Sequence, residues 1–183
     1  MQTDEELIKE FQRSGDRQVL HELTIRHIAK VRSVVSQMVS DESRVDDLTQ
    51  EVFLRSFRGL PAFNHRSQFS TWLYRVTLNT VYGYIDRNGR SPVEFHAELP
   101  ETAETGTDSP GDAVMRSELA DRVDSAMNLL SPSLRAAIVL TSIQGHGVAE
   151  AARIAGCNVG TMYWRVHKAR KLLQRQLAKY LRP

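Results

Sequence analysis

Residues 148–161 read VAEAARIAGCNVGT and decide the fold of the C-terminal part of the chain. The first eight residues are rich in helix formers and contain no Pro or Gly, which predicts a short helix. Gly156 is the residue type that usually follows a helix C-terminus, and Asn158 suits the N-cap of a second helix. The stretch therefore predicts two helices joined by a three-residue turn.

The second helix is expected from about Val159 towards Tyr180, with one apolar and one basic face. Apolar residues recur at helical spacing and predict an inward stripe of Met162, Val166, Ala169 and Leu173. The opposite face carries Tyr163, Trp164, Arg165, His167, Lys168 and Lys171. Such a face suits the major groove of DNA, where Lys and Arg attract phosphates. The alternative is a surface hairpin of a helix bundle whose charges are merely solvated.

Charge is unevenly distributed along the 183 residues, although the 24 basic and 22 acidic residues nearly cancel. Residues 144–183 contain eight Lys or Arg against one acid, a net charge of +7. Residues 93–112 contain six acids and no Lys or Arg, a net charge of −6. This segregation predicts a basic binding module beside an acidic linker.

The rest of the chain predicts helices and turns only. Helical patterns cover about 3–14, 17–38, 43–58 and 67–87, and they resume from about 112 to 145. Strand signals are absent, and residues 93–112 are rich in Glu, Thr, Pro and Gly without periodicity. We therefore expect an all-α protein with two small helical domains joined by a flexible acidic linker, the C-terminal domain containing the helix-turn-helix.

Several classes of protein are disfavoured by the composition. The single cysteine, Cys157, excludes an intramolecular disulfide. The sequence shows no signal peptide and no apolar run long enough to span a bilayer, so we expect a cytoplasmic protein without membrane insertion. The six His residues are scattered without metal-site spacing, and neither a Gly-rich phosphate loop nor a nucleophile elbow occurs. These patterns argue against an enzyme, a bound metal and a cofactor.

The helix expected at 43–58 has an unusual outer face. A helical projection turns Val45, Leu48, Val52 and Ser56 towards the core. The opposite side carries Asp47, Gln50, Glu51 and Leu54. An exposed leucine with an acidic rim is either an ordinary surface residue or a protein-docking patch.

The helix expected at 67–87 interleaves aromatic side chains with Arg and Asn, which suits the stacking of single-stranded bases. Residues 61–92 carry four Arg and one Asp, so a net charge of +3 attracts a nucleic-acid backbone. The short polar loop at 64–67 suits the capture of an extruded base. The alternative is that the apolar residues of this helix are simply core, namely Phe69, Trp72, Leu73 and Val76.

Three motifs, in order and at matching spacing, resemble those of the extracytoplasmic-function group of bacterial RNA polymerase sigma factors. Residues 46–53, DDLTQEVF, resemble the helix that binds the polymerase clamp. Residues 69–79, FSTWLYRVTLN, are similar to the most diagnostic stretch of the family. Residues 156–161, GCNVGT, followed by RVHKAR at 165–170, look like its promoter-reading helix-turn-helix. The resemblance covers nearly the whole chain.

The resemblance implies a division of labour. Residues 1–92 would form a region 2-like domain that docks on core RNA polymerase through Asp47, Gln50, Glu51 and Leu54. This domain would also bind −10 promoter DNA through Phe63, Asn64, His65, Arg66, Ser67, Asn79, Tyr82, Arg87 and Arg90. Residues 113–183 would form a region 4-like domain that reads −35 DNA through Thr161, Tyr163, Trp164, Arg165, His167, Lys168 and Lys171. The linker, 93–112, would lie in the RNA-exit path, and an anti-sigma factor commonly holds family members inactive.

The chain departs from the family at three places. Asn158 stands where Pro is usual, and both residues suit a helix start. Ala151 replaces a larger aliphatic residue, which predicts looser packing of the first helix. Tyr163 and Trp164 replace basic or small residues, so the −35 preference of the family is not carried over. The remaining alternative is a stand-alone helix-turn-helix regulator, which would leave the 69–79 stretch and Leu54 without a role.

Overall fold

The computed structural model describes residues 2–88 and 122–178, and within them the chain forms helices and turns without strands. The N-terminal helices are α1 (Asp4–Ser14), α2 (Arg17–Met38), α3 (Val45–Gly59) and α4 (Phe69–Arg87). The second group comprises a helical stretch at 122–128, α6 (Pro132–Ile138), α7 (Val148–Ala155) and α8 (Val159–Leu177). The expected all-α fold is confirmed. The expected linker, 93–112, lies outside the described residues.

The ends of the first helices follow from the local sequence. Thr3 and Glu6 form a capping box, in which the Glu6 amide donates to Thr3 Oγ1 and the Thr3 amide donates to Glu6 Oε2. Gly15 ends α1 with a φ of 70°, a left-handed conformation that glycine adopts without steric cost. Asp16 then caps α2 by accepting a hydrogen bond from the Gln18 amide at 2.9 Å.

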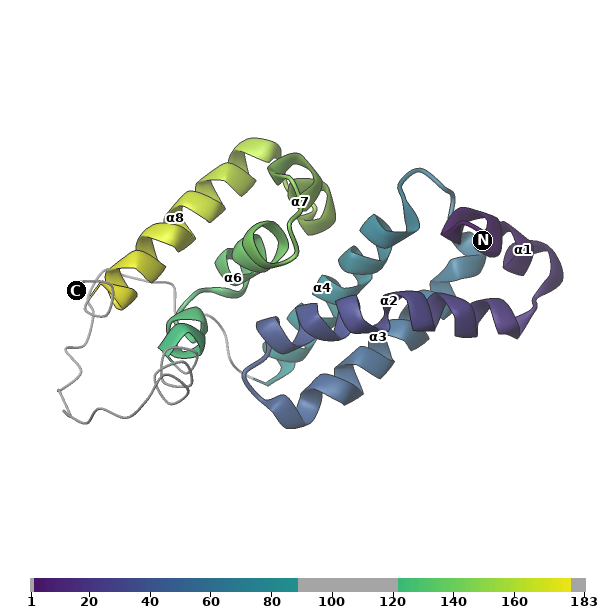
Figure 1. The fold of residues 1–183 in the computed structure, drawn as a ribbon, viewed down its shortest axis with the longest axis horizontal. Helices are drawn as coiled ribbons and strands as arrows, with labels where there is room; N and C mark the ends of the chain where they lie inside the picture. The colour runs from purple at the N-terminus through teal and green to yellow at the C-terminus, as the bar shows by residue number, and fades with distance from the viewer. Residues whose placement is uncertain (1, 89–121, 179–183) are drawn as a thin grey trace.

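The N-terminal group packs α2, α3 and α4 side by side, and α1 lies against α2 at the far end (Figure 1). The expected apolar faces are buried, among them those of Leu23, Val31 and Leu73. His27, on the α2 stripe, is buried as well, and its Nε2 lies 2.6 Å from Asp4 Oδ2. His27 is therefore a paired core histidine.

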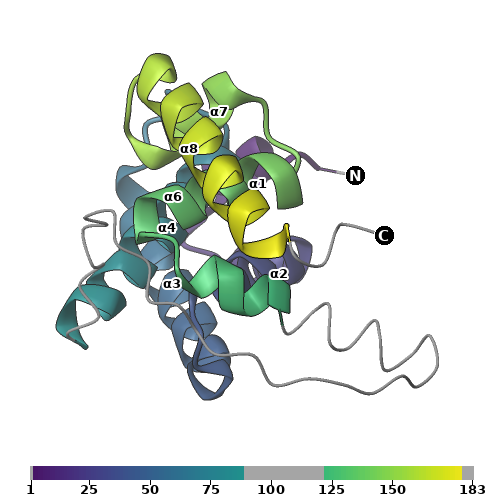
Figure 2. The ribbon, with the colours of Figure 1, turned by 90° about the vertical axis from the view of Figure 1, so that its left-hand side faces the viewer.

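The C-terminal group packs α8 across α6, with α7 against the start of α8 (Figures 1 and 2). One π-helical turn, Val139–Ile143, follows α6 and carries the chain into Gln144 and Gly145. Gly145 has a φ of 75°, which ends this helical run where the sequence predicted. None of the described helices is both long and apolar enough to cross a membrane.

The two groups of helices also pack on each other, and their buried apolar residues form one continuous cluster. α7 contacts α4, while α6 and the π-helical turn contact α2 (Figure 2). The sequence did not predict this contact. As a result, the two groups share an interface, called the joint below. At this joint, surfaces for which the sequence predicted different roles lie close together.

Candidate nucleic-acid interface

The turn between α7 and α8 has the predicted geometry. Gly156 ends α7 in the left-handed region with a φ of 65°. Asn158 caps α8, because its Oδ1 accepts a hydrogen bond from the Thr161 amide at 2.6 Å. The inward stripe buries Met162, Val166 and Ala169. The sequence therefore fixes which side of α8 faces the solvent.

The outer face of α8 is aromatic at its start and basic further along. Tyr163 and Trp164 are 62% and 57% exposed. His167, Lys168 and Lys171 are exposed, whereas Thr161 and Arg165 are half-buried. The Lys168 ammonium lies 4.7 Å from the centre of the Trp164 ring. This cation–π contact orients both side chains, so the aromatic and basic parts of the face act as one surface.

The outer face of α3 also matches the helical projection. Val45, Leu48, Val52 and Ser56 are buried. On the opposite side Leu54 is 50% exposed, Asp47 and Gln50 are exposed, and Glu51 is half-buried. Asp47 pairs with Arg44 at 3.5 Å, and Glu51 pairs with Arg55. These pairs are at the surface, where each contributes about 0–1 kcal/mol, so the acids remain available to a partner.

The loop before α4 contains both buried and exposed residues. Phe63 is only 7% exposed, and its ring packs against those of Trp72 at 5.3 Å and Phe69 at 6.2 Å between centroids. His65 is half-buried. The exposed members are Asn64, Arg66 and Ser67. Three of the five predicted loop residues therefore face solvent, while Phe63 forms part of the support beneath them.

The predicted residues of α4 lie along one side of the helix. Asn79 and Arg87 are exposed and Tyr82 is half-buried. Arg90 lies outside the described residues. Burial raises the pKa of the Tyr82 phenol to about 12, against the opposing effect of the nearby Arg165 charge. Tyr82 and Arg165 were predicted to contact different DNA elements, yet here they are neighbours across the joint.

Two clefts lie between the halves at this place. The larger, of about 870 Å³, is lined by Asn64, Arg66, Ser67, Trp72 and Arg75 from one half and by Glu150 and Arg153 of α7 from the other, among others. The smaller is lined by Arg75, Leu78, Asn79 and Tyr82 together with the end of α7. Arg75 Nη2 donates to the main-chain carbonyl of Arg153 at 2.5 Å. The first helix of the helix-turn-helix therefore covers the side of α4 that carries the predicted −10 contacts.

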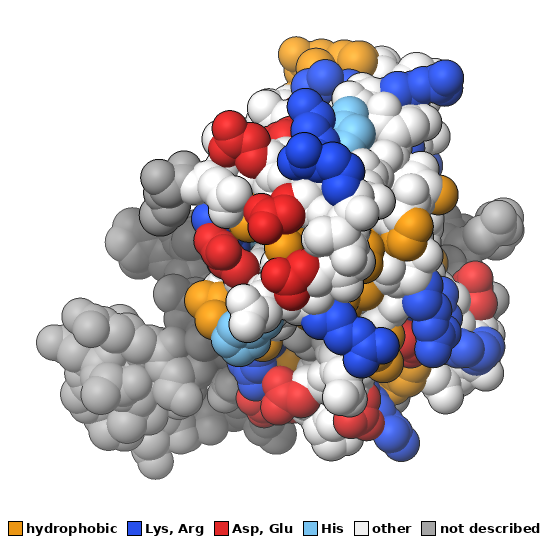
Figure 3. Space-filling view, turned by 90° about the vertical axis from the view of Figure 1, so that its right-hand side faces the viewer, with side chains coloured by type: hydrophobic (Ala, Val, Ile, Leu, Met, Phe, Trp, Pro, Cys, Tyr) orange, Lys and Arg blue, Asp and Glu red, His pale blue; other side chains and the backbone are white. Residues whose placement is uncertain are grey.

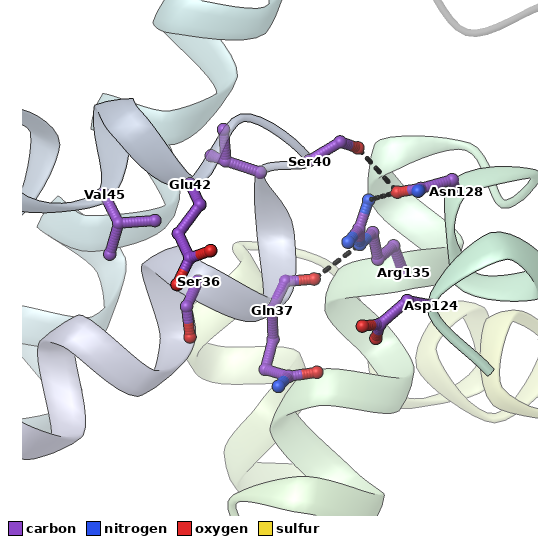
Figure 4. A pocket seen from close by; sticks show the side chains of 9 residues that line it. Ser36, Gln37, Ser40, Glu42, Val45, Asp124, Asn128 and Arg135 are labelled. Carbon is purple, nitrogen blue, oxygen red and sulfur yellow. Dashed lines mark hydrogen bonds between the residues drawn. The ribbon is translucent and has the colours of Figure 1, made fainter. Parts of the chain in front are cut away.

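A second set of polar contacts closes the joint beside the end of α2 (Figure 4). Arg135, 9% exposed, donates to the Gln37 carbonyl and to Asn128 Oδ1, and Ser40 Oγ donates to the same Asn128 oxygen. Burial lowers the pKa of the Arg135 guanidinium. Gln144 adds a link, because its Nε2 donates to Ser33 Oγ at 3.0 Å. Arg135 is the buried member of this set, and a buried charged group that has its hydrogen-bond partners in place favours one arrangement of the elements it joins.

Sequence reasoning missed the residues of this joint. Arg135, Asn128 and Gln144 lie 88 to 111 positions from the residues of α2 and its end that they contact. Helical periodicity reports only which side of one helix is apolar, so it carries no signal for such pairs. Arg75 and Arg153, which line the larger cleft, were also absent from the predicted contact set. In the described part of the chain no cluster of His, Cys, Asp and Glu could hold a metal ion.

Both halves of the chain match models of known protein families. The Sigma-70 region 2 model matches residues 23–91, and the Sigma-70 region 4 model matches residues 120–173. The ECF RNA polymerase sigma-E factor of Haemophilus influenzae is 31% identical over 182 residues, covering 96% of this chain and 95% of the relative. The sigma-E factor of Escherichia coli K12 is 32% identical over 98% of this chain and 97% of its own length.

Solved structures give the same assignment. The structure of CnrH in complex with the cytosolic domain of CnrY has a TM-score of 0.70 and 27% identity, covering 96% of this chain and 97% of CnrH. A stand-alone regulator has no use for region 2, and sigma factors are initiation factors rather than enzymes, so both alternatives are set aside. The chain belongs to the extracytoplasmic-function group of the sigma-70 family of RNA polymerase sigma factors.

Proposed function

We propose that this sigma factor directs core RNA polymerase to promoters through three surfaces: the outer face of α3, the loop and α4 face, and the outer face of α8. The observation that carries the proposal is the exposure of these faces on the halves that match regions 2 and 4. We assign residues 1–92 and 113–183 to the two domains and 93–112 to the linker. Because polymerase and chromosome are cytoplasmic, we place its action there.

Docking on polymerase uses the α3 face. Leu54 is half exposed, and Asp47, Gln50 and Glu51 surround it with polar and acidic groups. An apolar anchor with a charged rim buries one leucine on binding and uses charge to exclude wrong partners. The existing Asp47–Arg44 and Glu51–Arg55 pairs are weak enough to exchange for basic groups of the polymerase.

Binding of the −10 element uses the loop and α4. Asn64, Arg66 and Ser67 are exposed beside the cleft and are suited to an extruded base and its phosphates. Phe63 and His65 support the loop rather than touch the base. Asn79, Tyr82 and Arg87 then follow the strand along α4, and we extend this track to Arg90.

Binding of the −35 element uses α8 in the major groove. Lys168, Lys171 and Arg165 attract phosphates, while Thr161 and His167 are placed for polar contacts. Tyr163 and Trp164 project from the first turns of the helix, where base edges are usually read. We therefore propose that apolar contact with thymine methyl groups contributes to the −35 preference.

The arrangement of the halves represents the DNA-free protein. α7 lies over part of the α4 face, so the −10 element does not have full access to that surface. The similarity to CnrH, which was solved bound to the cytosolic domain of CnrY, extends over both halves. This supports a role for an anti-sigma factor that stabilises the closed arrangement until a signal releases it.

Transcription from a randomised promoter library tests the function. Core polymerase with this protein should enrich templates that share two short elements at fixed separation upstream of the start site. Core polymerase alone is the control. Enrichment of a single element, or of no element, would contradict promoter recognition at two sites.

A further inference from the structure

Helix α1 has no assigned task, although it packs against α2 at the far end of the N-terminal half. The region 2 match begins at residue 23, so it leaves α1 out. Its first turn is acidic, with Asp4, Glu5 and Glu6. The molecular face at this end mixes acidic, basic and apolar side chains (Figure 3). Because its charges are mixed, this face does not favour DNA binding. A contribution of α1 to function therefore depends on the residues that it contacts.

One side chain of α1 holds the loop that precedes α4. Gln12 Nε2 donates two hydrogen bonds, to the Leu60 carbonyl at 3.0 Å and to the Phe63 carbonyl at 2.9 Å. Its Oε1 lies 3.2 Å from His65 Nε2. Because both amide hydrogens are used on carbonyls, Oε1 is the acceptor and His65 Nε2 carries the proton. The Gln12 carboxamide therefore makes hydrogen bonds to three residues before α4, namely Leu60, Phe63 and His65.

The loop needs this support at His65. Among the described residues His65 is the non-glycine residue with a positive φ, 56°, a left-handed conformation that side chains with a Cβ disfavour. Its ring lies edge-on to Phe63, with the ring centres 4.9 Å apart. Its Nδ1 is buried without a hydrogen-bond partner, as expected for the lone pair of the tautomer protonated at Nε2. Contacts with Gln12 and Phe63 thus hold His65 in a backbone conformation that most side chains disfavour.

The residues exposed by this conformation are those that face the cleft. Asn64 precedes His65 and Arg66 follows it, and both line the cleft together with Ser67. Asn64 Oδ1 accepts a hydrogen bond from the Arg66 amide at 3.2 Å, which ties the two together. A change at His65 would therefore turn both of its neighbours.

We infer that Gln12 is a positioning residue for promoter opening: it locks His65 in the left-handed conformation and so presents Asn64, Arg66 and Ser67 to the extruded −10 base. Gln12 itself touches no DNA. This inference rests on the proposed function, in which the loop receives that base.

The test compares Gln12→Ala and Gln12→Glu with Gln18→Ala, an exposed glutamine of α2. The DNA probe is the promoter selected from the random library, with 2-aminopurine in the −10 element. We expect Gln12→Ala to lower the rate of open-complex formation about tenfold, because two neutral hydrogen bonds are lost. Gln12→Glu should lower the rate of open-complex formation similarly, since a carboxylate cannot donate hydrogen bonds to the two carbonyls. Binding to core polymerase should stay close to wild type in all three variants, whereas the melting temperature should fall by a few degrees in the two Gln12 variants, because two hydrogen bonds are lost.

A second measurement does not depend on transcription. Hydrogen exchange over residues 60–68 should become faster in Gln12→Ala and remain unchanged in Gln18→Ala. Unchanged exchange in Gln12→Ala, or wild-type opening by that variant, would overturn the inference. A parallel loss of core binding and melting temperature would also overturn it, because it would indicate a merely structural role. Failure of the wild-type protein to open any promoter would instead count against the proposed function, and the exchange result would still decide the role of Gln12.

Discussion

The Arg135 guanidinium, in α6, donates a hydrogen bond to the main-chain carbonyl of Gln37 in the last turn of α2. The carbonyls of a final helical turn lack partners within the helix and carry partial negative charge, so a buried cation stabilises them. A residue of the half that matches region 4 thus completes the end of a helix in the half that matches region 2. This contact makes the closed arrangement a specific state, with defined groups to break when it opens.

Replacing Arg135 by Ala should loosen the joint. The variant loses hydrogen bonds made by a charged donor, worth about 2 kcal/mol, and leaves the Gln37 carbonyl and Asn128 Oδ1 with fewer partners. Small-angle scattering should show a larger radius of gyration for the free protein. Arg17→Ala removes the same charge from an exposed position and serves as the control. An unchanged radius for Arg135→Ala would show that the apolar contacts alone hold the halves together.

Replacing Asp47 and Leu54 together by Ala should weaken binding to core polymerase. A half-exposed leucine and a rim charge of a docking patch together contribute about 1–3 kcal/mol, so the dissociation constant should rise about 5- to 150-fold. Fluorescence titration of core enzyme measures this. Ile25→Ala with Asp86→Ala removes another exposed aliphatic side chain and another exposed acid as the matched control. Equal affinities of the two double variants would speak against the α3 face.

Arg165→Ala and Lys168→Ala should each weaken binding to −35 duplex DNA and make it less sensitive to salt. Each side chain that neutralises a phosphate releases about one counterion, so the slope of log affinity against log salt should fall by about one. Lys30→Ala, at an exposed position of α2, should leave the slope unchanged. A wild-type slope in both α8 variants would remove their phosphate role.

Alkaline pH should loosen the joint at Tyr82. Burial raises the pKa of this phenol to about 12, from about 10 in the unfolded chain, so its contribution is complete below pH 10. It is lost as pH rises from about 10 to 12, because the unfolded form releases its proton first. Tyr82→Phe removes this dependence, so the variant should lose less unfolding free energy than wild type between pH 9.5 and 11.5. Urea unfolding at both values measures the difference, and identical losses would contradict the buried position.

Much of the local structure could be predicted from the sequence because its causes are local. The Asn158 cap, the Gly156 turn and the buried side of α8 depend on residues within one or two helical turns. The exposure of Leu54 followed from helical geometry alone. Such features can be predicted without knowing which helix packs against them.

The parts that could not be predicted depend on contacts between distant residues. Phe63 lies in a polar loop by sequence, yet it is buried because the rings of Phe69 and Trp72 receive it. Gln12 gave no periodic signal, although it holds a loop about 50 residues further along. Arg165 belongs to the outer face of α8 by sequence, yet it is half-buried, and its charge acts on Tyr82 of the other half.

The distance between the halves tests most directly whether they are closed on each other in the free protein and separate in the promoter complex. Spin labels can replace Gln68, just before α4, and Arg153 of α7, which are both exposed and line the same cleft, in a chain that carries Cys157→Ser. We expect one narrow, short distance in the free protein and a longer distance in the complex with core polymerase and promoter DNA. A long or broad distance in the free protein, or the same short distance in the promoter complex, would contradict this expectation.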